Sequence, residues 1–407
     1  MSKRTLIIII TNIVFSTFYS QNKEYVFNIC KELASKEYAG RGYTSFPNSK
    51  DIGIHKAEKR IVQEIQKIGA YDLKKYIANS KHFKKRITFE KLNFTDKINP
   101  SELLISTNNI LKSNVSINDK PLLLGIDYIP DATCPSIDFS GELEYYDSLH
   151  YINQEKKIVI QLEKQLMHSA SPIQEDFVLL HINRNSFSFQ EKKIFCKIKI
   201  DTKLEKIFSD NIYAFVPGTQ YPDSFIVFSA HYDHLGNIDT VYFPGANDNA
   251  SGVAVLMDLM QYYKKHPHRY SVAFYFFTGE EIGLVGSKYY VDHPFFDLNR
   301  IKCLINLDLM GGGSEGIMVV NGKIFENDFQ KLETINKEKN FNIPIKSRGK
   351  AQNSDHYWFT ENGVKSFFIY TLGDIRAYHN PQDVDQNLKF NNYDKIFQII
   401  IEWINTF

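Results

Sequence analysis

Short apolar runs recur through the second half of the chain and predict the buried strands of an α/β fold. Runs of this kind are typical of strands that are covered on both faces in a mostly parallel sheet. Four of them, rich in Val, Ile, Phe and Tyr, occupy residues 225–228, 272–277, 304–307 and 367–370. An apolar helix is expected to begin around Val253, and another around residues 396–404 is expected to close the chain. The pattern therefore predicts a mixed, mostly parallel sheet flanked by helices.

The residues before this fold show three other patterns. Residues 1–20 read as a signal peptide, because Lys3 and Arg4 precede an apolar stretch that is shorter than the roughly 20 residues of a membrane span. Residues 21–85 are expected to be helical and to pack on the main domain. Within them the apolar positions from Ala57 to Ile68 have helical spacing, and Gly69 stands where a C-terminal cap belongs.

Residues 86–205 are expected to form a small β-rich insertion, and residues 206–407 the main α/β domain. The insertion is predicted from β-type runs separated by polar turns, without long helical patterns. These runs lie at residues 87–89, 122–124, 142–146, 158–162, 177–182 and 194–200.

Side chains that commonly bind metal ions follow the four apolar runs of the main domain. Because ligands bind outside the carboxyl ends of strands in an open α/β sheet, these residues are expected to meet in one crevice. They are His231, Glu280, Glu281, Asp308 and, after a longer loop, His379. Asp248 completes the set from a turn just before the helix at Val253.

Two His and several carboxylates are the ligands of a hydrolytic metal centre rather than of a closed structural zinc site, which would use Cys. With His231 and Asp308 on one ion, Glu281 and His379 on a second, and Asp248 between them, each ion has three protein ligands and an open position for water. Glu280 is left without a ligand role. It is therefore the candidate general base that takes the proton from water and passes it to the leaving amine.

Five ordered blocks of the sequence resemble the co-catalytic zinc aminopeptidases of peptidase family M28. The blocks are His231 to Gly236, Asn247 to Gly252, Phe277 to Ser287, Asn306 to Asp308, and Tyr378 with His379. The resemblance implies two zinc ions held by the ligands named above, Glu280 as the base, and peptide substrates with a free amino terminus.

The same resemblance implies roles for residues beside the ligands. Asp233 would orient His231, and the hydroxyl of Tyr378 would stabilise the oxyanion of the tetrahedral intermediate. Asp383 matches an acidic position of the family, and the peptide bond after Asp248 would be cis. The turn at residues 39–42 resembles an N-terminal element of secreted members, and the insertion resembles the protease-associated domain in position.

Several alternatives stay open at this point. Taken singly, each residue of the set has an ordinary structural explanation, such as a helix cap or a turn residue. His356 competes with His379 as the last ligand, although Ser354 and Asp355 suit the cap of a short helix ending at Gly363. His234 is interpreted as a residue of the pocket wall. A glutaminyl-cyclase-like, carboxypeptidase or dipeptidase activity, or a non-catalytic binding module on the same fold, would also suit the pattern.

Composition adds the compartment and excludes one class of partner. The 407 residues carry a formal net charge of +1 and have no long basic run, so nucleic-acid binding is not expected. With the signal peptide removed, no membrane span is expected, and the protein is predicted to be secreted or periplasmic. Export would permit a disulfide bond, and Cys134 with Cys196 is one conceivable pair.

Overall fold

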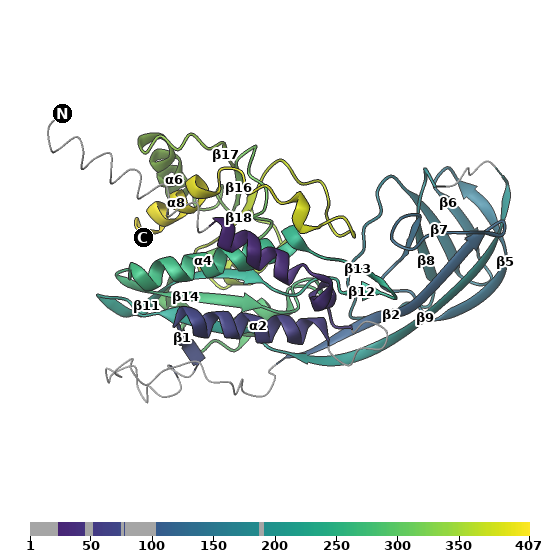
Figure 1. The fold of residues 1–407 in the computed structure, drawn as a ribbon, viewed down its shortest axis with the longest axis horizontal. Helices are drawn as coiled ribbons and strands as arrows, with labels where there is room; N and C mark the ends of the chain where they lie inside the picture. The colour runs from purple at the N-terminus through teal and green to yellow at the C-terminus, as the bar shows by residue number, and fades with distance from the viewer. Residues whose placement is uncertain (1–22, 45–51, 75–76, 78–102, 187–190) are drawn as a thin grey trace.

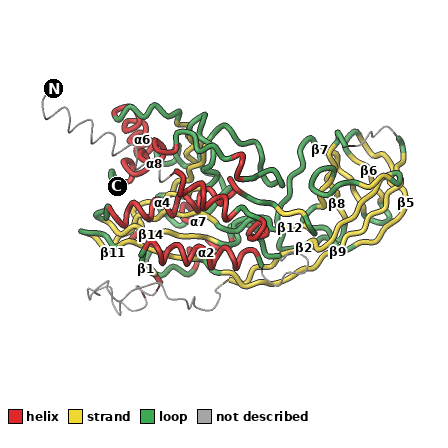
Figure 2. Tube along the Cα trace, in the orientation of Figure 1, coloured by secondary structure: helices red, strands yellow, loops and turns green. Residues whose placement is uncertain are grey.

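The computed structural model describes residues 23–44, 52–74, 77, 103–186 and 191–407. Two eight-stranded sheets form its framework: one is flanked by helices, and the other extends to one side (Figures 1 and 2). The predicted signal peptide and the predicted run at residues 87–89 lie outside the described residues. None of the helices in the described ranges has the length and apolar character that a membrane span needs.

The first sheet is mixed and mostly parallel at its centre, which confirms the predicted fold class. Strands β14, β11, β15 and β18 are neighbours in that order, and each pair of neighbours is parallel. Each predicted apolar run lies inside one of these strands. From edge to edge the order is β1 (Tyr71–Asp72), β10 (Ile212–Val216), β14 (Tyr270–Phe277), β11 (Tyr221–His231), β15 (Ile301–Leu307), β18 (Ser366–Thr371), β16 (Ile317–Val320) and β17 (Ile345–Arg348).

Helices cover both faces of this sheet, so its strands alternate their side chains between two cores. In β11, Ile226 and Phe228 join the core formed with α2 (Gly53–Ile68), α4 (Gly252–Lys265), α6 (Glu326–Glu338) and α8 (Tyr393–Ile404). Phe225 and Val227 join the opposite core with α5 (Val285–Asp292) and α7 (His356–Glu361). Helix α2 ends as predicted, because Gly69 adopts the left-handed conformation, with φ 77°, and its backbone N–H caps the helix.

The residues of the predicted insertion form most of the second sheet. A long antiparallel ribbon of β2 (Leu103–Ile117) and β9 (Lys193–Ser209) leads out of the helix-flanked sheet toward it (Figure 1). The remaining strands are β3 (Lys120–Pro121), β5 (Ile137–Asp147), β6 (His150–Asn153), β7 (Ile158–Glu163), β8 (Val178–Asn183) and β4 (Tyr128–Pro130). Four of the predicted β-type runs lie in β5, β7, β8 and β9. The segment boundaries at residues 20, 85 and 205 stay predictions.

Two features of the insertion differ from the sequence pattern. The run at residues 122–124 was predicted to be a strand, but it is a loop with one isolated bridge at Leu124, in which Leu122 is buried. Burial of an apolar side chain does not require strand pairing. All four cysteines are buried and free, so Cys134 and Cys196 are not bridged.

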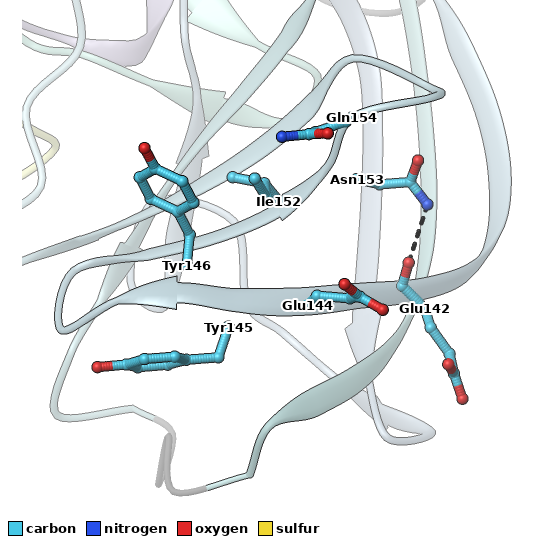
Figure 3. A pocket seen from close by; sticks show the side chains of 7 residues that line it. All are labelled: Glu142, Glu144, Tyr145, Tyr146, Ile152, Asn153 and Gln154. Carbon is cyan, nitrogen blue, oxygen red and sulfur yellow. Dashed lines mark hydrogen bonds between the residues drawn. The ribbon is translucent and has the colours of Figure 1, made fainter.

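A surface hollow lies at the far end of the insertion, on β5 and β6 (Figure 3). Tyr145 and Tyr146 line it and are exposed, beside Glu142 and Glu144. Lys193 forms ion pairs with both carboxylates, at 3.1 Å each, so part of their charge is balanced within the protein. The hollow contains none of the predicted site residues.

Candidate metal centre

The predicted ligands gather at the carboxyl ends of the central strands. His231 is the last residue of β11, and Asp308 directly follows β15. Glu280 and Glu281 follow β14 after a short turn, and Asp248 lies in the segment Ala246–Ser251 before α4, where its own backbone is not helical. His379 comes from the long loop after β18. Parallel strands place these exits on one edge of the sheet, as the sequence predicts.

The five side chains form a continuous chain of close contacts. Nε2 of His231 lies 3.4 Å from both Asp248 Oδ1 and Asp308 Oδ2. Nε2 of His379 lies 3.1 Å from Asp248 Oδ2 and 3.2 Å from Glu281 Oε2. Asp248 therefore contacts both imidazoles with different oxygens, which is the bridging position that the sequence suggests for it.

The donor atoms suit divalent cations. His231, Asp248 and Asp308 place one donor atom each within 4.8 Å of one another, and so do His234, Asp248 and Glu281. Oδ1 of Asp308 and Nε2 of His234 are buried and have no hydrogen-bond partner in the described part of the chain. Buried polar atoms without partners are costly unless a ligand satisfies them. Imidazole and carboxylate donors of this kind, with buried atoms that have no partner, fit zinc.

His234, which the sequence analysis interprets as a residue of the pocket wall, contacts a member of the centre directly. Its Nδ1 lies 2.6 Å from Oε1 of Glu281, and its ring meets that of His379 edge-on at 5.8 Å. Glu281 is thus held between two imidazoles, one on each oxygen. The interpretation from sequence missed this contact, although His234 lies in the same motif block as His231.

The charges of the centre shift the pKa values of its members in opposite directions. Burial opposes the effect, but the charges of Glu280 and Asp308 raise the pKa of His231 well above its ordinary value. Burial likewise opposes the change at Glu281, whose pKa falls to about 2 beside His379. Burial raises the pKa of Glu280 well above its usual range, and the neighbouring charge of Glu281 adds to this effect. The two adjacent glutamates therefore have different chemistry.

Asp233 connects His231 to the turn that carries Glu280 and Glu281. Its side chain accepts hydrogen bonds from the backbone N–H groups of Glu280 (3.2 Å) and Glu281 (3.3 Å). Nδ1 of His231 lies 3.1 Å from the backbone oxygen of Asp233 and 3.7 Å from its carboxylate. Tyr43 adds a hydroxyl that donates to Asp233 and accepts from Gly279 N–H. Nothing in the local sequence marks Tyr43 for this role.

Two buried charged residues hold the turn of Asp248. The Asp383 carboxylate accepts from the backbone N–H groups of Asn247 (2.9 Å) and Asp248 (3.0 Å). The Arg41 guanidinium donates to five backbone carbonyls, those of Leu33, Tyr232, Pro244, Gly245 and Asp248, at 2.7–3.1 Å. The peptide bond between Asp248 and Asn249 is cis, as the resemblance implies.

Asp308 is held by Ser354, which the sequence analysis suggests as a helix cap. Ser354 Oγ donates to Asp308 Oδ2 at 3.0 Å and accepts from Asn306 Nδ2 at 2.8 Å. The expected short helix α7 follows, with Asp355 at its N-cap position, but no side-chain hydrogen bond caps it. His356 is fully buried, its ring is tilted against that of Phe368 with centroids 5.4 Å apart, and neither of its ring nitrogens has a hydrogen-bond partner in the described part of the chain.

Tyr378 differs from the other predicted site residues in being 43% exposed. Its ring stacks on that of His379, with centroids 3.9 Å apart. Burial and the charge of Asp248 raise the pKa of its phenol, so the hydroxyl keeps its proton. An exposed phenol against a candidate ligand is available to a molecule entering the centre.

Comparison with known proteins agrees with this architecture. Residues 211–404 match the model of peptidase family M28. The aminopeptidase YwaD of Bacillus subtilis is 32% identical over 174 residues, which are 40% of this chain and 36% of that protein. The matched part of this chain spans about a third or less of the length of the curated relatives.

Two solved structures share the fold over nearly the whole chain. A zinc aminopeptidase from Bacillus subtilis has a TM-score of 0.63 and 17% identity, covering 94% of this chain and 93% of that one. An aminopeptidase from Aneurinibacillus sp. strain AM-1 has a TM-score of 0.62 and 16% identity, covering 94% and 92%. Residues 211–404, just under half of the chain, therefore match peptidase family M28, and the two solved structures share the fold.

Proposed function

We propose that the protein is an exported aminopeptidase with two zinc ions, which removes the first residue of peptides. The observation that carries this proposal is the chain of contacts from Asp308 through His231, Asp248 and His379 to Glu281. It provides one imidazole, one terminal carboxylate and a share of Asp248 for each of two cations. The family and the relatives named aminopeptidases support the same activity.

Two zinc ions would supply Lewis acidity for the substrate carbonyl and would acidify water. The protein itself would provide the proton transfer. Glu280 is adjacent to a proposed ligand, and burial raises its pKa well above that of an ordinary glutamate, which makes its carboxylate a stronger base. A carboxyl group of this kind can accept a proton from water and then deliver it to the leaving amine.

Tyr378 would stabilise the negative charge that forms on the substrate during the reaction. In peptide hydrolysis, negative charge develops on the former carbonyl oxygen only as the tetrahedral intermediate forms. A protonated phenol at the centre can donate a hydrogen bond to that oxygen, which lowers the energy of the transition state more than that of the bound substrate. Asp233 and Asp383 would keep the ligands and the base in position without contacting the substrate.

Cation stoichiometry together with a substrate panel tests the proposal. Metal analysis of the purified protein should give two divalent ions per chain, and chelation should abolish an activity that zinc restores. Aminoacyl-chromophore substrates should be hydrolysed, whereas their N-acetylated counterparts, which lack the free amine, should not. One tightly bound ion with no second site on titration would contradict the two-zinc proposal and favour the cyclase alternative.

A further inference from the structure

The insertion contacts one of the proposed ligands directly. His168 lies in the loop between β7 and β8, and it pairs with His379 through two hydrogen bonds. The backbone N–H of His168 donates to the His379 carbonyl at 2.8 Å. In return, the backbone oxygen of His168 lies 3.1 Å from Nδ1 of the His379 ring. The two residues are 211 positions apart in sequence.

His168 is itself fixed against the main domain. Its side chain is 8% exposed, and its ring stacks on Phe243 with centroids 4.9 Å apart. Phe243 is fully buried in the core of the insertion, together with Leu235 and Ile238. These three residues belong to the segment that follows His231 and His234. The insertion and this segment therefore share one hydrophobic core.

The contact with Nδ1 has a chemical consequence for the other ring nitrogen. Nε2 of His379 faces the carboxylates of Asp248 and Glu281. A neutral imidazole that offers Nε2 to a cation must carry its proton on Nδ1, and that N–H needs an acceptor. The His168 carbonyl is in the position of this acceptor. His379 also has a positive φ of 52°, so its backbone conformation depends on such contacts.

We propose that His168 is a positioning residue of the metal centre: its backbone carbonyl fixes the tautomer and orientation of His379, so the insertion completes one of the two cation sites. This inference rests on the proposed function, because it takes His379 to be a ligand. The site of Glu281 and His379 depends on the insertion. The other site takes His231 and Asp308 from the carboxyl ends of β11 and β15 in the main domain.

Replacing the amide that follows His168 with an ester tests the carbonyl directly. The α-hydroxy analogue of serine at position 169, an exposed residue, weakens the His168 carbonyl as an acceptor and leaves the His168 side chain unchanged. Zinc is then titrated into the metal-free protein in competition with a chromophoric chelator. We expect the affinity of one cation to fall about 10–100-fold, which is usual for the loss of such a partner, while the other cation binds as before.

Matched variants separate this role from a general loss of structure. An ester in place of the amide at Gln165, an exposed residue of the same loop, should leave both affinities unchanged. His168→Phe keeps a ring on Phe243 and the same backbone carbonyl, so it should keep both sites. His168→Ala removes the stacking and should weaken the same single site as the ester. The melting temperature of each metal-free variant shows whether the fold is retained.

The outcomes distinguish this inference from the proposed function. If the unmodified protein binds only one zinc ion, the two-zinc proposal fails before the variants are considered. If it binds two, but the ester at position 169 changes neither affinity or both equally, the role of His168 is overturned while the activity stands. Loss of a site in His168→Phe would also overturn it, because the imidazole rather than the carbonyl would then be required.

Discussion

Glu280 and Glu281 are adjacent in sequence, yet their carboxylates have different surroundings. Glu281 contacts His234 and His379, whereas no hydrogen bond within the described ranges engages the carboxylate of Glu280. Glu280→Gln should therefore lower turnover by about 10²–10⁴, the usual contribution of acid–base catalysis, with cation content unchanged. Steady-state kinetics with metal analysis checks this. Glu281→Gln is the matched comparison and should lose cation, and a Glu280 variant that keeps most of its turnover would show that the base is another group.

Tyr378 gives a second prediction at the scale of one atom. Tyr378→Phe keeps the ring that stacks on His379 and removes only the hydroxyl. If that hydroxyl donates to the oxyanion, turnover should fall by a factor that corresponds to about 2–4 kcal/mol, with little change in the Michaelis constant. A tyrosine that only packs predicts kinetics close to those of the unmodified enzyme. Kinetics of this variant decide between the two roles.

At the scale of elements, Arg41, the last residue of a short 3-10 helix (Lys36–Arg41), joins two segments of the centre, one at Tyr232 and one from Pro244 to Asp248. Neighbouring glycines permit this approach: a Cβ on Gly42 would lie 2.2 Å from the Gly236 Cα. Arg41→Met fills similar volume but removes a donor from five buried carbonyls, of which that of Gly245 keeps a second donor in the Ala250 N–H. We expect a loss of more than about 3 kcal/mol in the free energy of unfolding, because each unpaired buried group costs about 1–3 kcal/mol.

Urea unfolding of the metal-free protein measures this loss. The control is Lys197→Met, which breaks a surface ion pair with Asp119 and should cost less than about 1 kcal/mol. Equal midpoints for the two variants would mean that the carbonyls of the turn are satisfied without Arg41.

At the scale of the whole molecule, the centre concentrates carboxylates beside three imidazoles, those of His231, His234 and His379, and near the buried guanidinium of Arg41. Burial and like charges raise the pKa of Glu280, and burial, opposed by the charge of His231, raises that of Asp308. Zinc should therefore raise the melting temperature, since each site contributes about 2.7 kcal/mol when free zinc is a hundredfold above its dissociation constant. Calorimetry with zinc and with chelator tests this. For Asp308→Asn, zinc should raise the melting temperature by less than it does for the unmodified protein. Identical melting temperatures of the unmodified protein with zinc and with chelator would contradict a preformed centre.

The sequence by itself determined the four central parallel strands of the helix-flanked sheet (β14, β11, β15 and β18), the end of α2 at Gly69 and the residue types at the strand exits. Strands and helix ends depend on the pattern of neighbouring residues along the chain, and metal-binding ability depends on the chemistry of each side chain. Both can be read from the sequence. The predictions that failed also came from local sequence patterns. The apolar run at residues 122–124 is a loop, and β2 was not predicted, because its Thr107-Asn108-Asn109 stretch does not resemble a strand.

Only the tertiary structure decided what holds the ligands in place. Arg41 and His168 act on partners about 200 residues away, and those contacts are made largely to or by backbone carbonyls. Every residue has a carbonyl, so the residue type at position 168 or 245 carries no sign of the role. Sequence can show which side chains are able to bind a cation. Their orientation depends on backbone groups that the fold brings together.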